Sequence, residues 1–151
     1  MLIQTAMKKI LILTFVCATL LSKADYWTQK ASFPGPGRQV PSSFVIGNNG
    51  YVSCGDQGTL FNDLWEYNSV TNIWTQKANL PAAGRFGAVG FSINNKGYIG
   101  TGYGFNDFWE YNPVTNAWTQ KTNFGGTGRS YAVGFSIGNK GYIGLGGVRE
   151  H

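Results

Sequence analysis

The sequence has few of the residues on which catalysis, metal binding and disulfide formation depend. Its only histidine is the last residue, His151, and its only cysteines are Cys17 and Cys54. This set offers no Ser-His-Asp arrangement, no CxxC pair and no cluster of histidine metal ligands. We therefore predict no catalytic residues, no metal site and no cofactor.

Long hydrophobic runs are also lacking, apart from one near the start of the chain. Lys8 and Lys9 precede an apolar run over residues 10–21, and small residues precede a possible cut after Ala24. This order is typical of a secretory signal peptide, and the run is shorter than the roughly 20 residues of a membrane-spanning helix. The alternative is a buried first strand or helix. We predict a signal peptide over residues 1–24 and a secreted, periplasmic or cell-surface location.

Charged residues make up only 13% of the chain, and the net charge is +5. Lys8, Lys9 and Lys23 lie in the predicted leader, so nine basic residues face seven acidic ones in the remainder. No cluster of Lys and Arg is left that would favour a nucleic acid or an anionic membrane surface. We predict no nucleic-acid partner and no membrane span. Without Cys17, Cys54 is alone and cannot form an internal disulfide.

Helical periodicity is missing beyond the leader, and an internal repeat takes its place. The tetrapeptide WTQK begins at Trp27, Trp74 and Trp118, at separations of 47 and 44 residues. Each of these tryptophans is followed at a fixed distance by an arginine and then by a Gly-Tyr tyrosine: Arg38, Arg85 and Arg129, then Tyr51, Tyr98 and Tyr142. Repeats of about 20–50 residues are typical of solenoids, propellers and arrays.

Within one repeat the pattern is that of short strands. Val89, Phe91 and Ile93 alternate with small residues, and the Asn- and Gly-rich residues 94–97 follow. Alternation with a period of two indicates a half-buried strand, and Asn and Gly favour a hairpin turn. Two further strands are expected around the tryptophans. We predict four antiparallel strands in each repeat, with a β-sandwich as the alternative.

The repeat resembles the kelch family of β-propellers, including the galactose-oxidase-like kelch domains, and the resemblance covers residues 25–147. It rests on the Asn-Asp-x-Trp-x-Tyr strands, the Gly-Tyr tyrosines, the WTQK tryptophans and the strand-ending glycines Gly100, Gly102, Gly144, Gly146 and Gly147. It implies an all-β fold of kelch-type propeller blades with four antiparallel strands each, of a secreted bacterial type.

The repeat boundaries predict an outer strand over 25–30, blades over 42–77 and 86–121, and a half blade over 131–147. This is fewer than the roughly 4–8 blades of a propeller, so the ring is incomplete. We expect either a fragment of a ring of about six or seven blades or two chains that share one ring. Uncovered blade faces of several hundred Å² would favour self-association.

Two kinds of loop are expected at the same end of every blade. One kind joins the fourth strand of a blade to the first strand of the next blade, and the other joins the second strand to the third strand within a blade. Loops on a rigid scaffold concentrate binding residues, and aromatic side chains are frequent contacts. The candidate ligand-binding residues are Asp56, Gln57, Phe61, Tyr103, Phe105, Arg38, Arg85 and Arg129. The arginines have a structural alternative, in which they bond loop carbonyls or the recurring Glu66 and Glu110. The recurring tryptophans are assigned to packing, and Cys54 to a buried position.

These features predict a non-catalytic module that binds a protein or a glycan on the face with these loops. The alternative is a fragment of a carbohydrate-active propeller enzyme. The kelch-like propellers that the repeat resembles include copper-dependent galactose oxidases and sialic acid mutarotases. The oxidases need histidine ligands that this chain lacks, whereas the catalytic residues of a mutarotase could lie in further blades.

Overall fold

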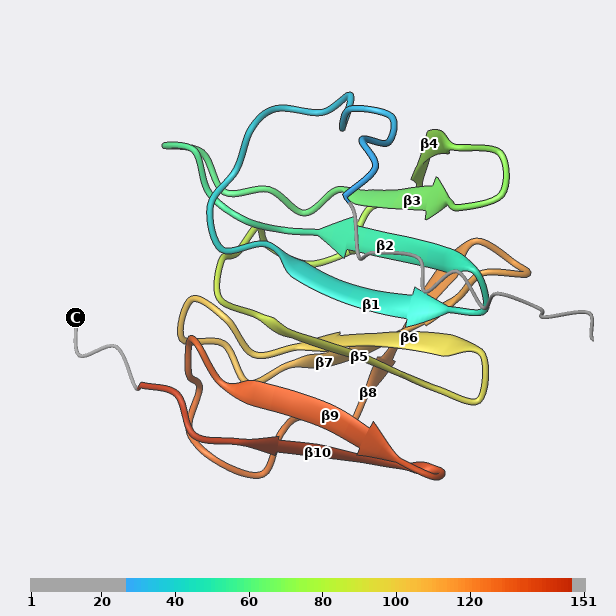
Figure 1. Ribbon diagram of the computed structural model, residues 1–151. Helices are drawn as coiled ribbons and strands as arrows, with labels where there is room; N and C mark the ends of the chain where they lie inside the picture. The colour runs from blue at the N-terminus through green and yellow to red at the C-terminus, as the bar shows by residue number, and fades with distance from the viewer. Residues whose placement is uncertain (1–26, 148–151) are drawn as a thin grey trace, which may run out of the picture.

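The computed structural model describes residues 27–147, which form an all-β fold without a helix in that range (Figure 1). The strands are β1 (Ser42–Ile46), β2 (Asn49–Ser53), β3 (Leu64–Asn68), β4 (Ile73–Lys77), β5 (Val89–Ile93), β6 (Lys96–Gly100), β7 (Phe108–Asn112), β8 (Ala117–Lys121), β9 (Val133–Ile137) and β10 (Lys140–Gly144). No helix able to cross a membrane occurs in this described range.

The strands form three antiparallel sheets in which sequence neighbours are paired. The first sheet has the order β1-β2-β3-β4, the second β5-β6-β7-β8, and the third pairs β9 with β10. The Asn-rich turns were predicted from the sequence, and Asn94 and Asn95 have φ angles of 50° and 60°. This left-handed region favours Asn and Gly. The prediction of propeller blades with four antiparallel strands is confirmed, with the third sheet present as two strands.

The sheets are stacked through their first strands, and β1, β5 and β9 lie side by side (Figure 1). Glycine permits the close approach of neighbouring sheets. A Cβ atom at Gly97 of β6 would overlap the ring of Phe44 on β1, and one at Gly141 of β10 would overlap the ring of Phe91 on β5. The Gly-Tyr repeat therefore marks the place where one sheet receives a phenylalanine from the sheet before it.

The main core lies between the first two sheets and draws side chains from both. Phe44, Tyr51 and Leu64 come from the first sheet, and Ile99 and Tyr111 come from the second, all nearly inaccessible to solvent. Burial of one such large side chain contributes about 1.5–3 kcal/mol. Each four-stranded sheet therefore depends on its neighbour for much of its stability.

Two sequence predictions about the start of the domain need correction. Residues 27–30 form no strand, although an outer strand was predicted over 25–30; residues 25 and 26, like the predicted signal peptide over 1–24, lie outside the described residues. Trp27 was assigned to packing, but its side chain is fully exposed, with a relative accessibility of 103%. In each of the two complete sheets the fourth strand pairs with the third strand of the same sheet. In the described range no third strand lies beside β10.

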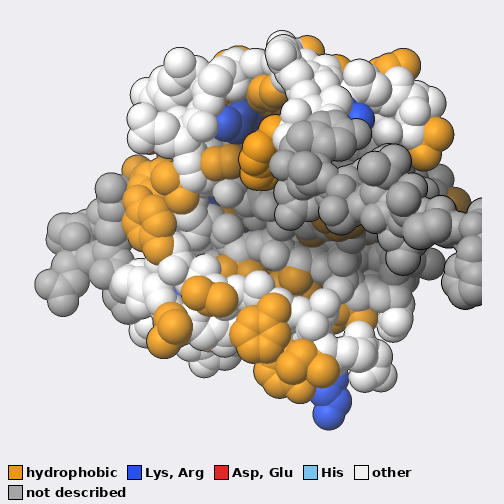
Figure 2. Space-filling model, in the orientation of Figure 1, with side chains coloured by type: hydrophobic (Ala, Val, Ile, Leu, Met, Phe, Trp, Pro, Cys, Tyr) orange, Lys and Arg blue, Asp and Glu red, His pale blue; other side chains and the backbone are white. Residues whose placement is uncertain are grey.

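The third sheet presents apolar side chains to solvent. Val133, Phe135 and Ile137 of β9 are each more than half exposed, whereas Val89 and Phe91, their counterparts on β5, are buried. Figure 2 shows hydrophobic side chains gathered over the lower part of the molecule, where β9 and β10 lie in Figure 1. The difference arises because β9 has a neighbouring first strand on one side only.

Candidate functional site

The loop end of the sheets is built around buried arginines. Arg38 donates from Nη1 and Nη2 to the two carboxylate oxygens of Asp63, at 2.5 and 2.8 Å, and from Nη1 to the carbonyl of Cys54 at 3.0 Å. Arg85 repeats the arrangement with both oxygens of Asp107 and with the carbonyl of Thr101 at 3.0 Å. Such bidentate pairs fix the loops in one geometry.

The geometry of Arg38 and Arg85 favours the structural alternative for these two arginines. Arg38 and Arg85 do bond loop carbonyls, but their acidic partners are not Glu66 and Glu110. Glu66 instead accepts a hydrogen bond from the Tyr51 hydroxyl at 2.8 Å. The glutamates lie on the middle of the third strands, out of reach of the loop end. With side chains 4% and 1% exposed, Arg38 and Arg85 cannot offer an open ring of guanidinium groups to a ligand.

The carboxylates of these pairs are held in the charged form. Burial raises the pKa of Asp63, but hydrogen bonds from Arg38 and Trp65 outweigh it, so the pKa lies below its ordinary value. The same balance of burial against hydrogen bonds from Arg85 and Trp109 lowers the pKa of Asp107. The Trp65 and Trp109 indoles thus support the ion pairs as well as the packing of the sheets.

Arg129 differs from the other two arginines. It donates to the carbonyl of Leu145 at 2.9 Å and lies over the ring of Phe124, with 4.7 Å between the guanidinium carbon and the ring centroid. No carboxylate within residues 27–147 forms an ion pair with it. Among the described residues no third strand lies beside β10, so the third sheet has no counterpart of Asp63 and Asp107 there.

The predicted loop residues form two groups. Phe61 lies against the Arg38 guanidinium at 4.4 Å, and Phe105 lies against the Arg85 guanidinium at 4.6 Å. Asp56 exchanges backbone hydrogen bonds with Gln39, at 2.8 and 3.0 Å, and Gln57 is exposed beside it. The half-buried Phe61 and Phe105 are therefore largely committed to their arginines, whereas Gln57 is available at the surface.

An aromatic cluster spans the loops between the second and third sheets. The ring of Phe86 lies 5.3 Å from that of Tyr103 and 5.7 Å from that of Tyr131, and Tyr103 lies 6.1 Å from Phe105. We call Phe86, Tyr103, Phe105 and Tyr131 the aromatic loop cluster. Tyr131 is 58% exposed, so the cluster reaches the surface.

A chain of backbone hydrogen bonds holds the entries to the first strands together. The amide of Gly87 donates to the carbonyl of Val40 at 3.1 Å, and the amide of Tyr131 donates to the carbonyl of Gly87 at 2.9 Å. All three residues have φ between 49° and 62°, a region that is unfavourable for Val and Tyr. Sequence reasoning missed Tyr131 as a site residue, although its alignment with Gly87 indicates a left-handed position.

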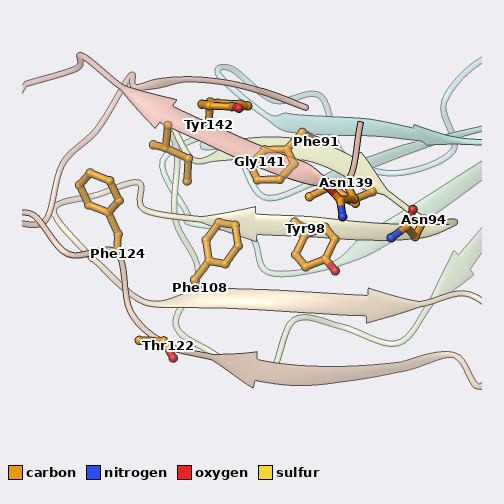
Figure 3. A pocket seen from close by; sticks show the side chains of 11 residues that line it. Phe91, Asn94, Tyr98, Phe108, Thr122, Phe124, Asn139, Gly141 and Tyr142 are labelled. Carbon is orange, nitrogen blue, oxygen red and sulfur yellow. The ribbon is translucent and has the colours of Figure 1, made fainter. Parts of the chain in front are cut away.

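A pocket of about 550 Å³ lies elsewhere, between the second sheet and β10 (Figure 3). Tyr142 is on one side, Tyr98 and Phe108 are on the other, and Phe124 closes one end. Burial, and then the hydrogen bond from its hydroxyl to Glu110, raise the pKa of Tyr98 to about 12. None of the eight predicted site residues lines this pocket, so it was not found from the sequence.

The described residues hold no group of three His, Cys, Asp or Glu side chains placed to bind a metal ion. No protein-family model matches the chain, and no curated protein matches it. Solved structures do show a similar fold. One of them, the structure of YjhT, superposes with a TM-score of 0.71 at 21% sequence identity, over 82% of this chain and 48% of that chain. The chain thus spans about half the length of YjhT. At this identity the likeness shows the fold.

Proposed function

We propose that this chain is part of an exported kelch-type propeller that binds a protein or a glycan at its loop end. The observation that carries the proposal is the aromatic loop cluster, in which Phe86 contacts Tyr103 and Tyr131. Aromatic rings supply large contact areas, and Tyr adds a polar group, which is why such residues dominate many binding surfaces. The antiparallel repeat and the four-stranded sheets support the kelch assignment.

The loop end is also rigid, which favours binding. The Arg85–Asp107 pair fixes the loop that carries Tyr103, and the amide of Arg129 donates to the carbonyl of Phe105 at 3.2 Å. A preformed surface loses little conformational freedom when a ligand binds. Arg129, without a carboxylate partner among the described residues, adds a positive charge beside the cluster. This charge favours ligands that carry carboxylates, such as acidic sugars or acidic peptides.

A fragment of a carbohydrate-active propeller enzyme, of the sialic acid mutarotase type, is the second proposal. It has the support of the fold, because a chain spanning half the length of YjhT leaves room for further blades that could hold catalytic residues. Within residues 27–147 two carboxylates at the loop end, Asp63 and Asp107, are paired with arginines, which suits a structural role, and Asp56 forms no ion pair.

The experiment screens the full chain against an array of neutral and sialylated glycans and against a phage-displayed peptide library. We expect ligands in at least one of the two screens, and their binding falls at least tenfold in Tyr131→Ala. The control is Val114→Ala, an exposed residue in the β7–β8 turn at the other end of the sheet. Ligands that bind Tyr131→Ala as well as the wild type, or no ligand in either screen, would overturn the proposal.

A further inference from the structure

The second sheet is clasped onto the first by two side chains of its outer strands. Tyr111 of β7 packs against Phe44 and Tyr51, with ring centroids 6.4 and 5.8 Å apart. The Trp118 indole of β8 donates to the carbonyl of Ala78 at 2.8 Å, and the amide of Ala78 donates to Asn116 Oδ1 at 2.9 Å. Ala78 of the preceding repeat thus forms hydrogen bonds with both the asparagine and the tryptophan of an Asn-x-Trp segment. We call this pair of hydrogen bonds the clasp.

The same clasp occurs a second time in the structure. The Trp74 indole donates to the carbonyl of Ala31 at 3.0 Å, and the amide of Ala31 donates to Asn72 Oδ1 at 2.9 Å. Ala31 and Ala78 each follow directly after WTQK. The third residue in this position is Thr122, which is exposed and lines the pocket.

The pocket repeats the surface that holds Tyr111 and Trp118. Its residues Phe91, Tyr98, Phe108, Thr122 and Phe124 stand one repeat after Phe44, Tyr51, Leu64, Ala78 and Leu80. Figure 3 shows Phe108 and Tyr98 along one side of the space, Phe124 at one end of it and Thr122 beyond Phe108. The pocket is thus the counterpart of the surface on the first sheet that Tyr111 and Trp118 of the second sheet cover.

The edge of β10 carries a matching polar pattern. On the two complete sheets, the second-strand tyrosine donates to a glutamate of the third strand: Tyr51 to Glu66 at 2.8 Å and Tyr98 to Glu110 at 2.7 Å. On β10 the equivalent Tyr142 is 43% exposed, and no carboxylate among the described residues accepts a hydrogen bond from its hydroxyl. Lys140 stands where Lys96 binds Glu110 at 2.6 Å.

We propose that β10 and the pocket bind an acidic β-hairpin with the side-chain pattern of β7–β8. Its first strand adds to the β10 edge in the register of β6 and β7, where Gly97 faces Tyr111 and Tyr98 faces Glu110. The glutamate of the hairpin then meets Tyr142 and Lys140, its tyrosine packs on Phe91, and its Asn-x-Trp segment clasps Thr122. Main-chain pairing supplies affinity and side-chain pockets supply specificity in strand addition. This inference rests on the repeat geometry and is independent of the ligand at the loop end.

The test uses a fluorescein-labelled synthetic peptide of residues 106–121, titrated with the full chain and followed by fluorescence anisotropy. We expect saturable binding that weakens at least tenfold when the peptide carries Tyr111→Ala and Trp118→Ala. The peptide with Glu110→Gln binds several-fold more weakly, and the peptide with Val114→Ala binds as the parent does, because Val114 is 91% exposed in the turn.

Variants of the full chain test the role of the pocket itself. Thr122→Pro removes the backbone amide that would donate to the peptide. Thr122 lies in the loop directly after β8, and the extended conformation of the strand residue before it is compatible with a following proline. The variant is expected to weaken binding about tenfold, whereas Thr127→Ala, an exposed loop substitution, leaves it unchanged. Equal binding of the parent and the Tyr111→Ala/Trp118→Ala peptide, or no saturation up to about 1 mM, would overturn the proposal.

Sedimentation of the full chain with and without peptide distinguishes a different occupant. If a second copy of the chain covers the pocket, a stable dimer forms that excludes the peptide, and this outcome rejects a hairpin as the occupant. If the proposal is right, the peptide displaces the second copy from any dimer, because the peptide and the second copy need the same apolar surface on β10 and the second sheet.

Discussion

Replacing Asp107 with alanine removes the carboxylate to which two nitrogens of Arg85 and the indole of Trp109 donate. The Arg85 side chain is only 1% exposed, so water cannot take the place of the lost partner. Removing one member of a buried pair typically costs about 3–5 kcal/mol, because the other charge stays buried without a partner. We expect a loss of this size in the free energy of unfolding.

Urea denaturation followed by tryptophan fluorescence measures this loss. The matched control is Asp56→Ala, since Asp56 forms no ion pair in the described part of the chain; its expected cost is within about 0.5 kcal/mol. The double variant Arg85→Met/Asp107→Ala is expected to recover much of the loss, because no charge is left buried. A cost for Asp107→Ala below about 1 kcal/mol would refute the view that these pairs fix the loop end.

Three further predictions concern the same fold. The carboxylates that pair with the buried arginines have lowered pKa values, so their stabilising contribution is present above about pH 4 and is lost as the pH falls through the folded-state pKa; urea midpoints that do not fall between pH 5 and 3 would contradict this. Gly97→Ala is expected to cost about 1–3 kcal/mol because the new methyl group meets Phe44, while Gly50→Ala, at the same place in the first sheet with no atom within 4 Å, costs less than about 1 kcal/mol; thermal denaturation compares the two. Asn116→Ala is expected to cost about 0.5–1.5 kcal/mol by removing the acceptor for the Ala78 amide and the Tyr111 hydroxyl, and an unchanged melting temperature would argue against the clasp.

The strands and turns could be predicted because their signals are local and occur more than once. Alternation such as Val89-x-Phe91-x-Ile93 identifies a strand from adjacent residues, and the turns rich in Asn and Gly need only their own backbone preferences. The stacking of sheets followed from the same repetition, since one apolar sheet requires another to cover it.

The side-chain partners could not be predicted, because they depend on distances across the sheet. The repeat suggested Glu66 and Glu110 as the acidic partners of the arginines, and only the fold shows that Arg85 pairs with Asp107 while Glu110 pairs with Lys96. The exposure of Trp27 was not predicted, because the sequence repeats the tryptophan motif whereas packing also requires a neighbouring third strand. In the described range no third strand lies beside residues 27–30.

The pocket was missed because its residues look like core residues in the sequence. Phe91 and Tyr98 have the same spacing as the buried Phe44 and Tyr51, and only the arrangement of the third sheet shows that their common surface stays open. Two members of the aromatic loop cluster, Tyr103 and Phe105, were among the predicted site residues, since they lie in loops whose length and composition vary between repeats.

Hydrogen exchange measured by mass spectrometry on the full chain tests most directly whether each sheet is stabilised by the sheet stacked on it. Amides of β2 and β6, which lie in complete sheets that bury a shared core, are expected to exchange slowly and as one unit. Amides of β9 and β10, whose apolar side chains are largely exposed, are expected to exchange much faster and to slow when the hairpin peptide is added. Equal protection of all three sheets in the absence of the peptide would contradict the account.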